Sequence, residues 1–201
     1  MTTLAIRQRH RVLSIDPGTN HLGYAIMDVD YANSHEPIAL VEVGTLNAAV
    51  LSRPYTTLLE VHGEKVTKLY ALEQAIKRIL EAFKPDIIVS ESPYMGSFPQ
   101  AYAALVECLK TIRSALIEHN PCMPLHIIDP ASIKAAVGVS GKSGNKGLMT
   151  EAVADLVSKN AIITDVDIAT LDEHSVDSIA AGYAYIRPPS MTKKSSKKKS
   201  T

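Results

Sequence analysis

The alternation of apolar and polar residues in the N-terminal part of the chain predicts three short strands. Residues 11–16 form a β-rich run that stops at Pro17-Gly18, and similar runs return at 22–29 and 38–45. Each run is bounded by polar or turn-forming residues, which is typical of strands. The short connections between the runs favour an antiparallel meander.

The spacing of apolar residues then changes from that of a strand to that of a helix. Between Val61 and Phe83 apolar residues recur on one helical face, and Lys84-Pro85 ends the pattern. The uninterrupted apolar run 86–90 is typical of a buried parallel strand, with Glu91 at its carboxyl end. The rest of the chain is predicted to contain a helix over 97–119, a strand over 125–129, helical stretches near 131–137, 147–159 and 172–187, and a Gly/Ser/Lys-rich loop over 138–146.

This order of elements predicts an α/β fold. We expect a mixed five-stranded sheet, in which three antiparallel strands are followed by alternating helices and strands, with helices on both faces. A single domain is expected over 11–188, preceded by an N-terminal extension over 1–10 and followed by a basic, lysine-rich disordered tail over 189–201.

Composition narrows the setting in which this domain works. The chain of 201 residues is 46% hydrophobic, which suffices for one core, and no apolar run approaches the ~20 residues needed to cross a bilayer. The N-terminus lacks an apolar signal region, so we expect a soluble intracellular protein of a bacterial or phage-infected cytoplasm, or of an organelle. Cys108 and Cys122 form no CxxC pair, which argues against a zinc site or a disulfide framework.

Charge is unevenly distributed along the chain. Residues 191–201 contain five lysines and no acid, whereas the residues before them hold 16 basic and 21 acidic side chains, a formal charge of −5. The tail is therefore either a solubilising segment or a flexible arm that contacts phosphates.

Acidic side chains stand at the ends of three predicted elements. Asp16 ends the first strand, Glu91 follows the fourth, and Asp177 lies near the start of the last helix, three residues after His174. If the first and fourth strands are parallel neighbours, Asp16 and Glu91 meet at one edge of the sheet. The i, i+3 spacing puts His174 and Asp177 on one face of a helix that can cross this edge.

A group of carboxylates at one place repels itself unless a cation is bound. Mg²⁺ and Mn²⁺ prefer oxygen ligands, and two such ions ~4 Å apart activate water and stabilise a leaving oxygen at phosphorus. Each acid taken alone has an ordinary explanation, as a turn residue, a loop acid or a residue that favours the helix dipole. Their joint placement is what indicates a metal-dependent site.

Three segments resemble the motifs of the RuvC family of Holliday-junction resolvases, in the RNase H-like superfamily. Ile15–Tyr24 (IDPGTNHLGY) resembles the first motif, Val89–Glu91 the second, and His174–Ala180 the last, in which an acid or a histidine is followed by x-x-Asp. The resemblance spans roughly residues 11–187. It implies two Mg²⁺ ions per active site, which Mn²⁺ can replace, and leaves open whether the histidine binds metal or moves a proton. The implied catalytic and metal-binding residues are Asp16, Glu91, His174 and Asp177.

The same resemblance implies contacts with DNA. Tyr94 lies where family members carry an aromatic residue that wedges against junction bases, and stacking on an unpaired base contributes about 1–3 kcal/mol. A partly buried loop tyrosine is the alternative. The basic loop resembles the family's phosphate-contacting segment, although the choice between Lys142 and Lys146 stays open and a solvated loop is the alternative. The expected DNA-binding residues are Tyr94, Lys134, Lys142, Lys146, Lys193, Lys194, Lys197, Lys198 and Lys199.

The function implied by the resemblance is that of an Mg²⁺-dependent endodeoxyribonuclease. It would act as a homodimer and resolve four-way (Holliday) junctions by paired nicks that leave 5′-phosphate and 3′-hydroxyl ends. Apart from the resemblance, we expect the helix over 97–119 to form the dimer face. Neither a membrane nor a small-molecule cofactor is expected.

Three alternatives remain open at this point. One is a nuclease of the same fold that acts on flaps, other branched DNA or RNA–DNA hybrids, and another is a catalytically silent branched-DNA-binding protein. The third is an actin-like ATPase, because Asp16-x-Gly18-Thr19 also resembles a phosphate loop, but the chain is too short for the two domains that such proteins need.

Overall fold

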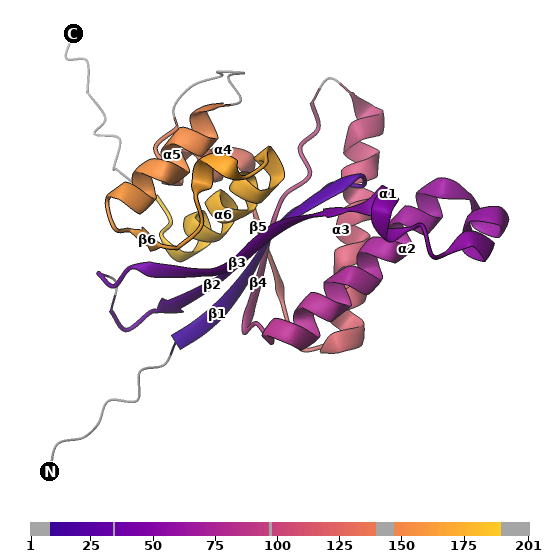
Figure 1. The fold of residues 1–201 in the computed structure, drawn as a ribbon, viewed down its shortest axis with the longest axis horizontal. Helices are drawn as coiled ribbons and strands as arrows, with labels where there is room; N and C mark the ends of the chain where they lie inside the picture. Colours follow the sequence, from indigo (N-terminus) through magenta and orange to yellow (C-terminus); the bar gives the residue numbers. More distant parts are fainter. Residues whose placement is uncertain (1–8, 34, 97, 140–146, 190–201) are drawn as a thin grey trace, which may run out of the picture.

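A six-stranded sheet forms the centre of the protein (Figure 1). The computed structural model describes residues 9–33, 35–96, 98–139 and 147–189. The strand order is β5-β4-β1-β2-β3-β6, with bounds β1 Arg9–Asp16, β2 His21–Asp30, β3 Ile38–Asn47, β4 Ile87–Glu91, β5 Leu125–Ile128 and β6 Ile162–Ile163. β1 begins two residues inside the expected N-terminal extension.

The predicted α/β class with a mixed sheet is confirmed, and the predicted number of strands is wrong by one. The additional strand, β6, pairs in parallel with β3 through only Ile162 and Ile163. Two residues are too few to produce an alternation of apolar and polar positions, so β6 has no signal in the sequence.

The pairing of the strands sets which ends of the sheet lie together. β1 is antiparallel to β2, and β2 is antiparallel to β3, as the meander predicts. β4 lies parallel to β1, with Ile15 opposite Ser90, and β5 lies parallel to β4. The carboxyl ends of β1 and β4 therefore meet at one edge of the sheet, which puts Asp16 near Glu91 as the sequence predicts.

Helices cover both faces of the sheet (Figure 1). On one side lie α2 (Thr56–Phe83) and α3 (Pro99–His119), packed on Leu13 and Ile15 of β1. On the other side the core of α4 (Pro130–Ala136), α5 (Gly147–Ser158) and α6 (Glu173–Ile186) packs on Val12 and Val89. Because side chains alternate along a strand, Asp16 belongs to the face of Val12, and Glu91 belongs to the face of Val89. Both acids therefore project on the side that α6 covers.

Two glycines allow α6 to lie close to the sheet. A Cβ atom added to Gly182 would stand 2.7 Å from the Ser14 hydroxyl oxygen, and one added to Gly23 would stand 2.0 Å from the backbone oxygen of His174. Ser14 also donates a hydrogen bond of 2.7 Å to the backbone oxygen of Ser178. These contacts fix the first turns of α6 against β1 and β2.

The region between β3 and β4 differs from the prediction at its start. A short helix, α1 (Ala48–Leu51), precedes α2, and α2 begins at Thr56 rather than near residue 61. Gly63 breaks the helical geometry inside α2, with φ 80° and ψ 171°, a conformation that glycine adopts readily. This break separates the first turns of α2 from the amphipathic stretch that the sequence indicates. No helix among the described residues has both the length and the apolar character needed to cross a bilayer.

Candidate active site

Two strand ends and the first turns of α6 bring the four predicted catalytic residues together. Asp16 is the last residue of β1, Glu91 is the last residue of β4, and His174 and Asp177 lie one turn apart at the start of α6. Asp172 caps this helix by accepting a hydrogen bond of 2.9 Å from the backbone N–H of Ser175. The cap explains locally why α6 begins where it presents its first residues to the strand ends.

The three carboxyl groups interact strongly through their charges. Burial and the negative charges of Asp16 and Asp177 raise the pKa of Glu91 to about 7. Burial and the charge of Asp16 raise the pKa of Asp177 to about 6. Burial also raises the pKa of Asp16, although the hydrogen bond with His174 opposes part of this increase. Charged carboxylates are therefore penalised at this edge of the sheet, as expected for buried groups of like charge.

His174 is tied directly to Asp16. Its Nδ1 atom lies 2.8 Å from Oδ2 of Asp16, and this hydrogen bond raises the pKa of the imidazole. An ionised carboxylate can only accept a hydrogen bond, so the proton of the ring is assigned to Nδ1. In the neutral ring Nε2 then keeps its lone pair, which can bind a cation or accept a proton.

The chemistry of these donors fits a hard divalent cation. Carboxylate oxygens are the ligands that Mg²⁺ prefers, and a bound cation offsets the repulsion that raises the pKa values of Glu91 and Asp177. The ligands are not in place beforehand: over the described ranges, no three His, Cys, Asp or Glu side chains are grouped so that they could hold a metal ion. One oxygen of Asp16 is engaged by His174 instead. Binding of a cation therefore requires these side chains to adjust.

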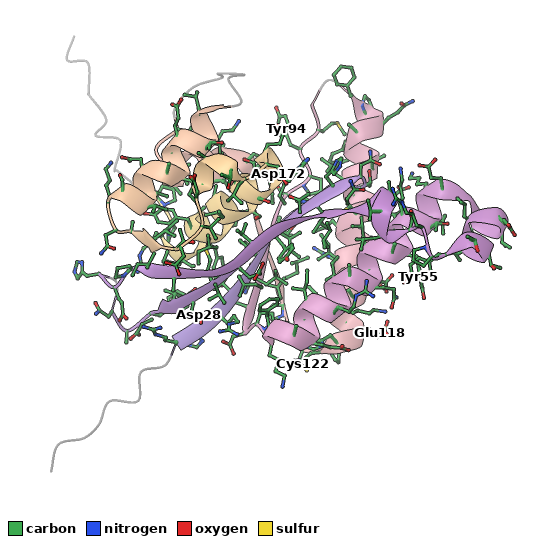
Figure 2. All side chains as sticks on the ribbon, in the orientation of Figure 1. Asp28, Tyr55, Tyr94, Glu118, Cys122 and Asp172 are labelled. Atoms are coloured by element: carbon green, nitrogen blue, oxygen red, sulfur yellow. The ribbon has the colours of Figure 1, made fainter. Side chains whose placement is uncertain are left out.

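Two of the predicted DNA-contacting residues lie in the described part of the chain. Tyr94 is 70% exposed on the loop between β4 and α3, which follows Glu91 directly (Figure 2). Lys134, on α4, lies near enough to the acids that its charge lowers the pKa values of Glu91 and Asp177. The other predicted residues, Lys142, Lys146, Lys193, Lys194, Lys197, Lys198 and Lys199, lie outside the described residues.

Sequence reasoning missed two side chains near the site. Phe98 is 75% exposed on the same loop as Tyr94, and it is one of only two phenylalanines in the chain. A rare aromatic residue just before Pro99, at the start of α3, was the available signal. His21 begins β2, and its ring stacks on that of His174. Its position two residues before Gly23 places it on the face of β2 that α6 covers, but only the structure shows this contact.

Comparison with known proteins shows what this chain is similar to. No protein-family model matches the chain. The crossover junction endodeoxyribonuclease RuvC of Bacteroides fragilis is 22% identical over 174 residues, which cover 87% of this chain and 80% of that protein. The RuvC protein of Cytophaga hutchinsonii is 28% identical over 148 residues, which cover 74% of this chain and 63% of that protein.

The chain is similar to RuvC crossover junction endodeoxyribonucleases over most of its length. Among solved structures, Thermus thermophilus RuvC in complex with a Holliday junction substrate superimposes with a TM-score of 0.66 at 18% identity, and the match covers 89% of this chain and 93% of that one. This likeness confirms the RNase H-like fold that the resemblance implies.

Proposed function

We propose that this protein is a metal-dependent, structure-selective DNA endonuclease that resolves four-way junctions by paired nicks. The products would carry 5′-phosphate and 3′-hydroxyl ends. The observation that carries this proposal is the group of partly buried, mutually repelling acids, Asp16, Glu91 and Asp177, at one edge of the sheet in a chain similar to RuvC proteins. Ionisable groups whose pKa is shifted by burial and by a charged neighbour are typical of functional sites.

The residues of the site have distinct proposed roles. Asp16, Glu91 and Asp177 provide oxygen ligands for two Mg²⁺ ions, which Mn²⁺ can replace and which, when bound, supply an activated water and stabilise the leaving oxygen. Asp16 also holds His174 by the Nδ1 hydrogen bond, so that Nε2 can complete the metal site or accept a proton. Lys134 balances part of the negative charge and attracts the phosphate backbone.

DNA recognition is proposed to extend from the acids along the neighbouring surface. The exposed rings of Tyr94 and Phe98 are suited to stack on bases that are unpaired at the junction. The lysines of the loop and tail named above would contact phosphates. Since the residues before the tail carry a net negative charge, these local basic groups, and not the overall charge, would guide the DNA.

A homodimer is the proposed assembly, with α3 as its interface. Val106 and Ile117 on this helix are 42% and 64% exposed, and their spacing of three helical turns places them on one face. Two active sites related by a two-fold axis match the symmetry of a four-way junction. A DNA substrate of this kind also implies that the protein works inside a cell.

The decisive experiment compares cleavage of a synthetic four-way junction by the wild type and by Asp16→Asn, with and without Mg²⁺. The variant removes a charged ligand but keeps the shape of the side chain, so we expect cleavage to fall to background while junction binding persists. Asp165→Asn, at an exposed position after β6, is the control and should cleave like the wild type. Equal cleavage by Asp16→Asn and the wild type would refute the proposed site.

Substrate selectivity is tested in the same assay with flaps, three-way branches and RNA–DNA hybrids of matched sequence. The proposal requires that the four-way junction be cut fastest and that the two nicks be placed symmetrically. Faster cleavage of a hybrid or a flap would keep the metal-dependent nuclease but overturn junction resolution.

A further inference from the structure

His21 lies against the proposed active site because of its position in β2. Side chains alternate along the strand, so His21 shares a face with Gly23 and Ala25, and Ala25 belongs to the core beneath α6. Gly23 lets the backbone of His174 approach more closely than any larger residue would allow. The first turn of α6 is thereby held directly over His21.

The imidazole rings of His21 and His174 are stacked. Their centroids are 5.6 Å apart and their planes differ by 19°, which lies in the range of offset stacking. The hydrogen bond from Nδ1 of His174 to Asp16 fixes one atom of the ring but leaves the ring free to tilt about that bond. A second planar group on the ring face opposes this tilt.

His21 is itself held in place by Asn47. The two residues are direct partners in the pairing of β2 with β3, and Nδ2 of Asn47 lies 3.3 Å from Nε2 of His21. Oδ1 of Asn47 accepts a hydrogen bond from the backbone N–H of Val50, where Asn47 caps α1. The amide NH₂ is therefore left to donate to His21, which assigns the ring proton of His21 to Nδ1.

We propose that His21 is a positioning residue, which holds the imidazole of His174 by stacking so that Nε2 points in one fixed direction. The inference rests on the proposed function, because the fixed direction matters where Nε2 meets a metal ion or a transferred proton. His21 and His174 also line one cavity of about 450 Å³, so the pair stands at the surface where a substrate can approach. A catalytic group tilted away from its productive orientation loses rate without losing substrate affinity.

The first test measures single-turnover cleavage of a four-way junction at saturating Mg²⁺ by His21→Ala and His21→Phe. We expect His21→Ala to slow cleavage about tenfold with an unchanged Kd for the junction. His21→Phe keeps a planar ring and should recover most of the rate. His35→Ala, an exposed histidine in the turn between β2 and β3, is the control and should match the wild type.

A double-mutant comparison separates positioning from a general loss of structure. If His21 acts through His174, then His21→Ala should have no further effect on the residual cleavage of His174→Ala. An equal loss in both backgrounds would contradict the inference, and so would a His21→Phe variant as slow as His21→Ala. Thermal unfolding of each variant verifies that the substitutions at His21 and His174 leave the fold intact.

A readout that needs neither metal nor substrate is the ¹⁵N NMR spectrum of the imidazole of His174. In the wild type and in His21→Phe we expect a slowly exchanging Nδ1–H signal, protected by the bond to Asp16, and in His21→Ala we expect faster exchange. If the wild type does not cleave junctions but this difference is present, the proposed function fails and the positioning role stands. If the wild type cleaves and His21→Ala matches it in both rate and exchange, the positioning role fails.

Discussion

Glu91 shows at the scale of one residue how burial and charge conflict in this site. Its carboxyl group is mostly buried and faces the charges of Asp16 and Asp177, which raises its pKa to about 7. An unfolded chain leaves the same group near 4.5, so the folded protein holds the proton more tightly. The contribution of Glu91 to stability is therefore most favourable below pH 4.5 and is lost as the pH rises through about 7.

Because the contribution of Glu91 to stability is lost as the pH rises, we predict that Glu91→Gln stabilises the metal-free protein at alkaline pH. At pH 8 the neutral amide avoids the penalty of a buried charge, and the free energy of unfolding should rise by about 3 kcal/mol, at 1.36 kcal/mol per unit of pKa. At pH 5, only about half a pH unit above the pKa of the unfolded group, the difference should shrink to about 1 kcal/mol or less. Urea unfolding at the two pH values measures this, with the exposed Glu81→Gln as the control. If the free energies of unfolding of Glu91→Gln and the wild type differed by the same amount at both pH values, the raised pKa of Glu91 would be contradicted.

A second prediction concerns competition between protons and Mg²⁺ for the same carboxylates. Since Glu91 and Asp177 have pKa values of about 7 and about 6, both hold protons at pH 5.5 and are ionised at pH 8. Metal binding must then displace protons at the lower pH. We expect half-maximal cleavage to require more Mg²⁺ at pH 5.5 than at pH 8, measured by titrating Mg²⁺ in the junction assay. An identical Mg²⁺ requirement at both pH values would exclude these groups as ligands.

At the scale of an element, the placement of α6 decides whether the acids on the strands meet those on the helix. Gly23 lies beneath the first turn of α6, and a Cβ atom there would overlap the backbone oxygen of His174. A backbone oxygen cannot avoid this overlap by rotating as a side chain can, so the whole helix would have to move away from β2. Such a shift carries His174 and Asp177 away from the strand ends together.

We therefore predict that Gly23→Ala damages both stability and catalysis. Overpacking of this kind costs about 1–3 kcal/mol, and cleavage should fall further than this loss of stability explains, because the site is also displaced. The matched control is Gly44→Ala, in the neighbouring strand β3, where a Cβ atom would meet the side chain of Tyr24 at 3.2 Å. Thermal unfolding and junction cleavage are measured for both variants. Equal losses of stability and of cleavage rate in the two variants would show that cleavage does not depend on the close approach of α6 to Gly23.

At the scale of the whole molecule, the arrangement of layers leaves the exposed face of α3 on the side of the sheet opposite α6. This face carries Val106 and Ile117, whereas the acids and His174 lie with α6. A dimer formed through α3 would therefore leave both active sites uncovered. Each site could then reach one strand of a symmetric junction.

The prediction at this scale is that Ile117→Glu converts the proposed dimer into monomers. A charged group at the centre of an apolar interface is desolvated without a partner, which disfavours association. Light scattering after gel filtration measures the mass, and the monomer should nick one strand of the junction without the paired second cut. Val61→Glu, at a 68% exposed position on α2, is the matched control. Dissociation by Val61→Glu alone would assign the interface to α2 instead.

The amino-acid sequence by itself determined the elements that have a strong local pattern. Alternation indicated β1 to β3, helical spacing indicated the later part of α2, and Pro17-Gly18 marked where Asp16 ends its strand. The same local signals pointed to Glu91, His174 and Asp177, because each stands at the end of a regular element. They did not indicate α1 or β6, because four and two residues are too short for a period to be visible.

Only the tertiary structure decided how these residues meet. Strand order brings Asp16 beside Glu91, and the close approach of α6 at Gly23 brings His174 onto both Asp16 and His21. The structure also shows that, among the described residues, no three possible ligands are grouped as a metal site, and that one oxygen of Asp16 bonds to His174. Proximity and desolvation depend on contacts between distant segments, and no local pattern of residues records them.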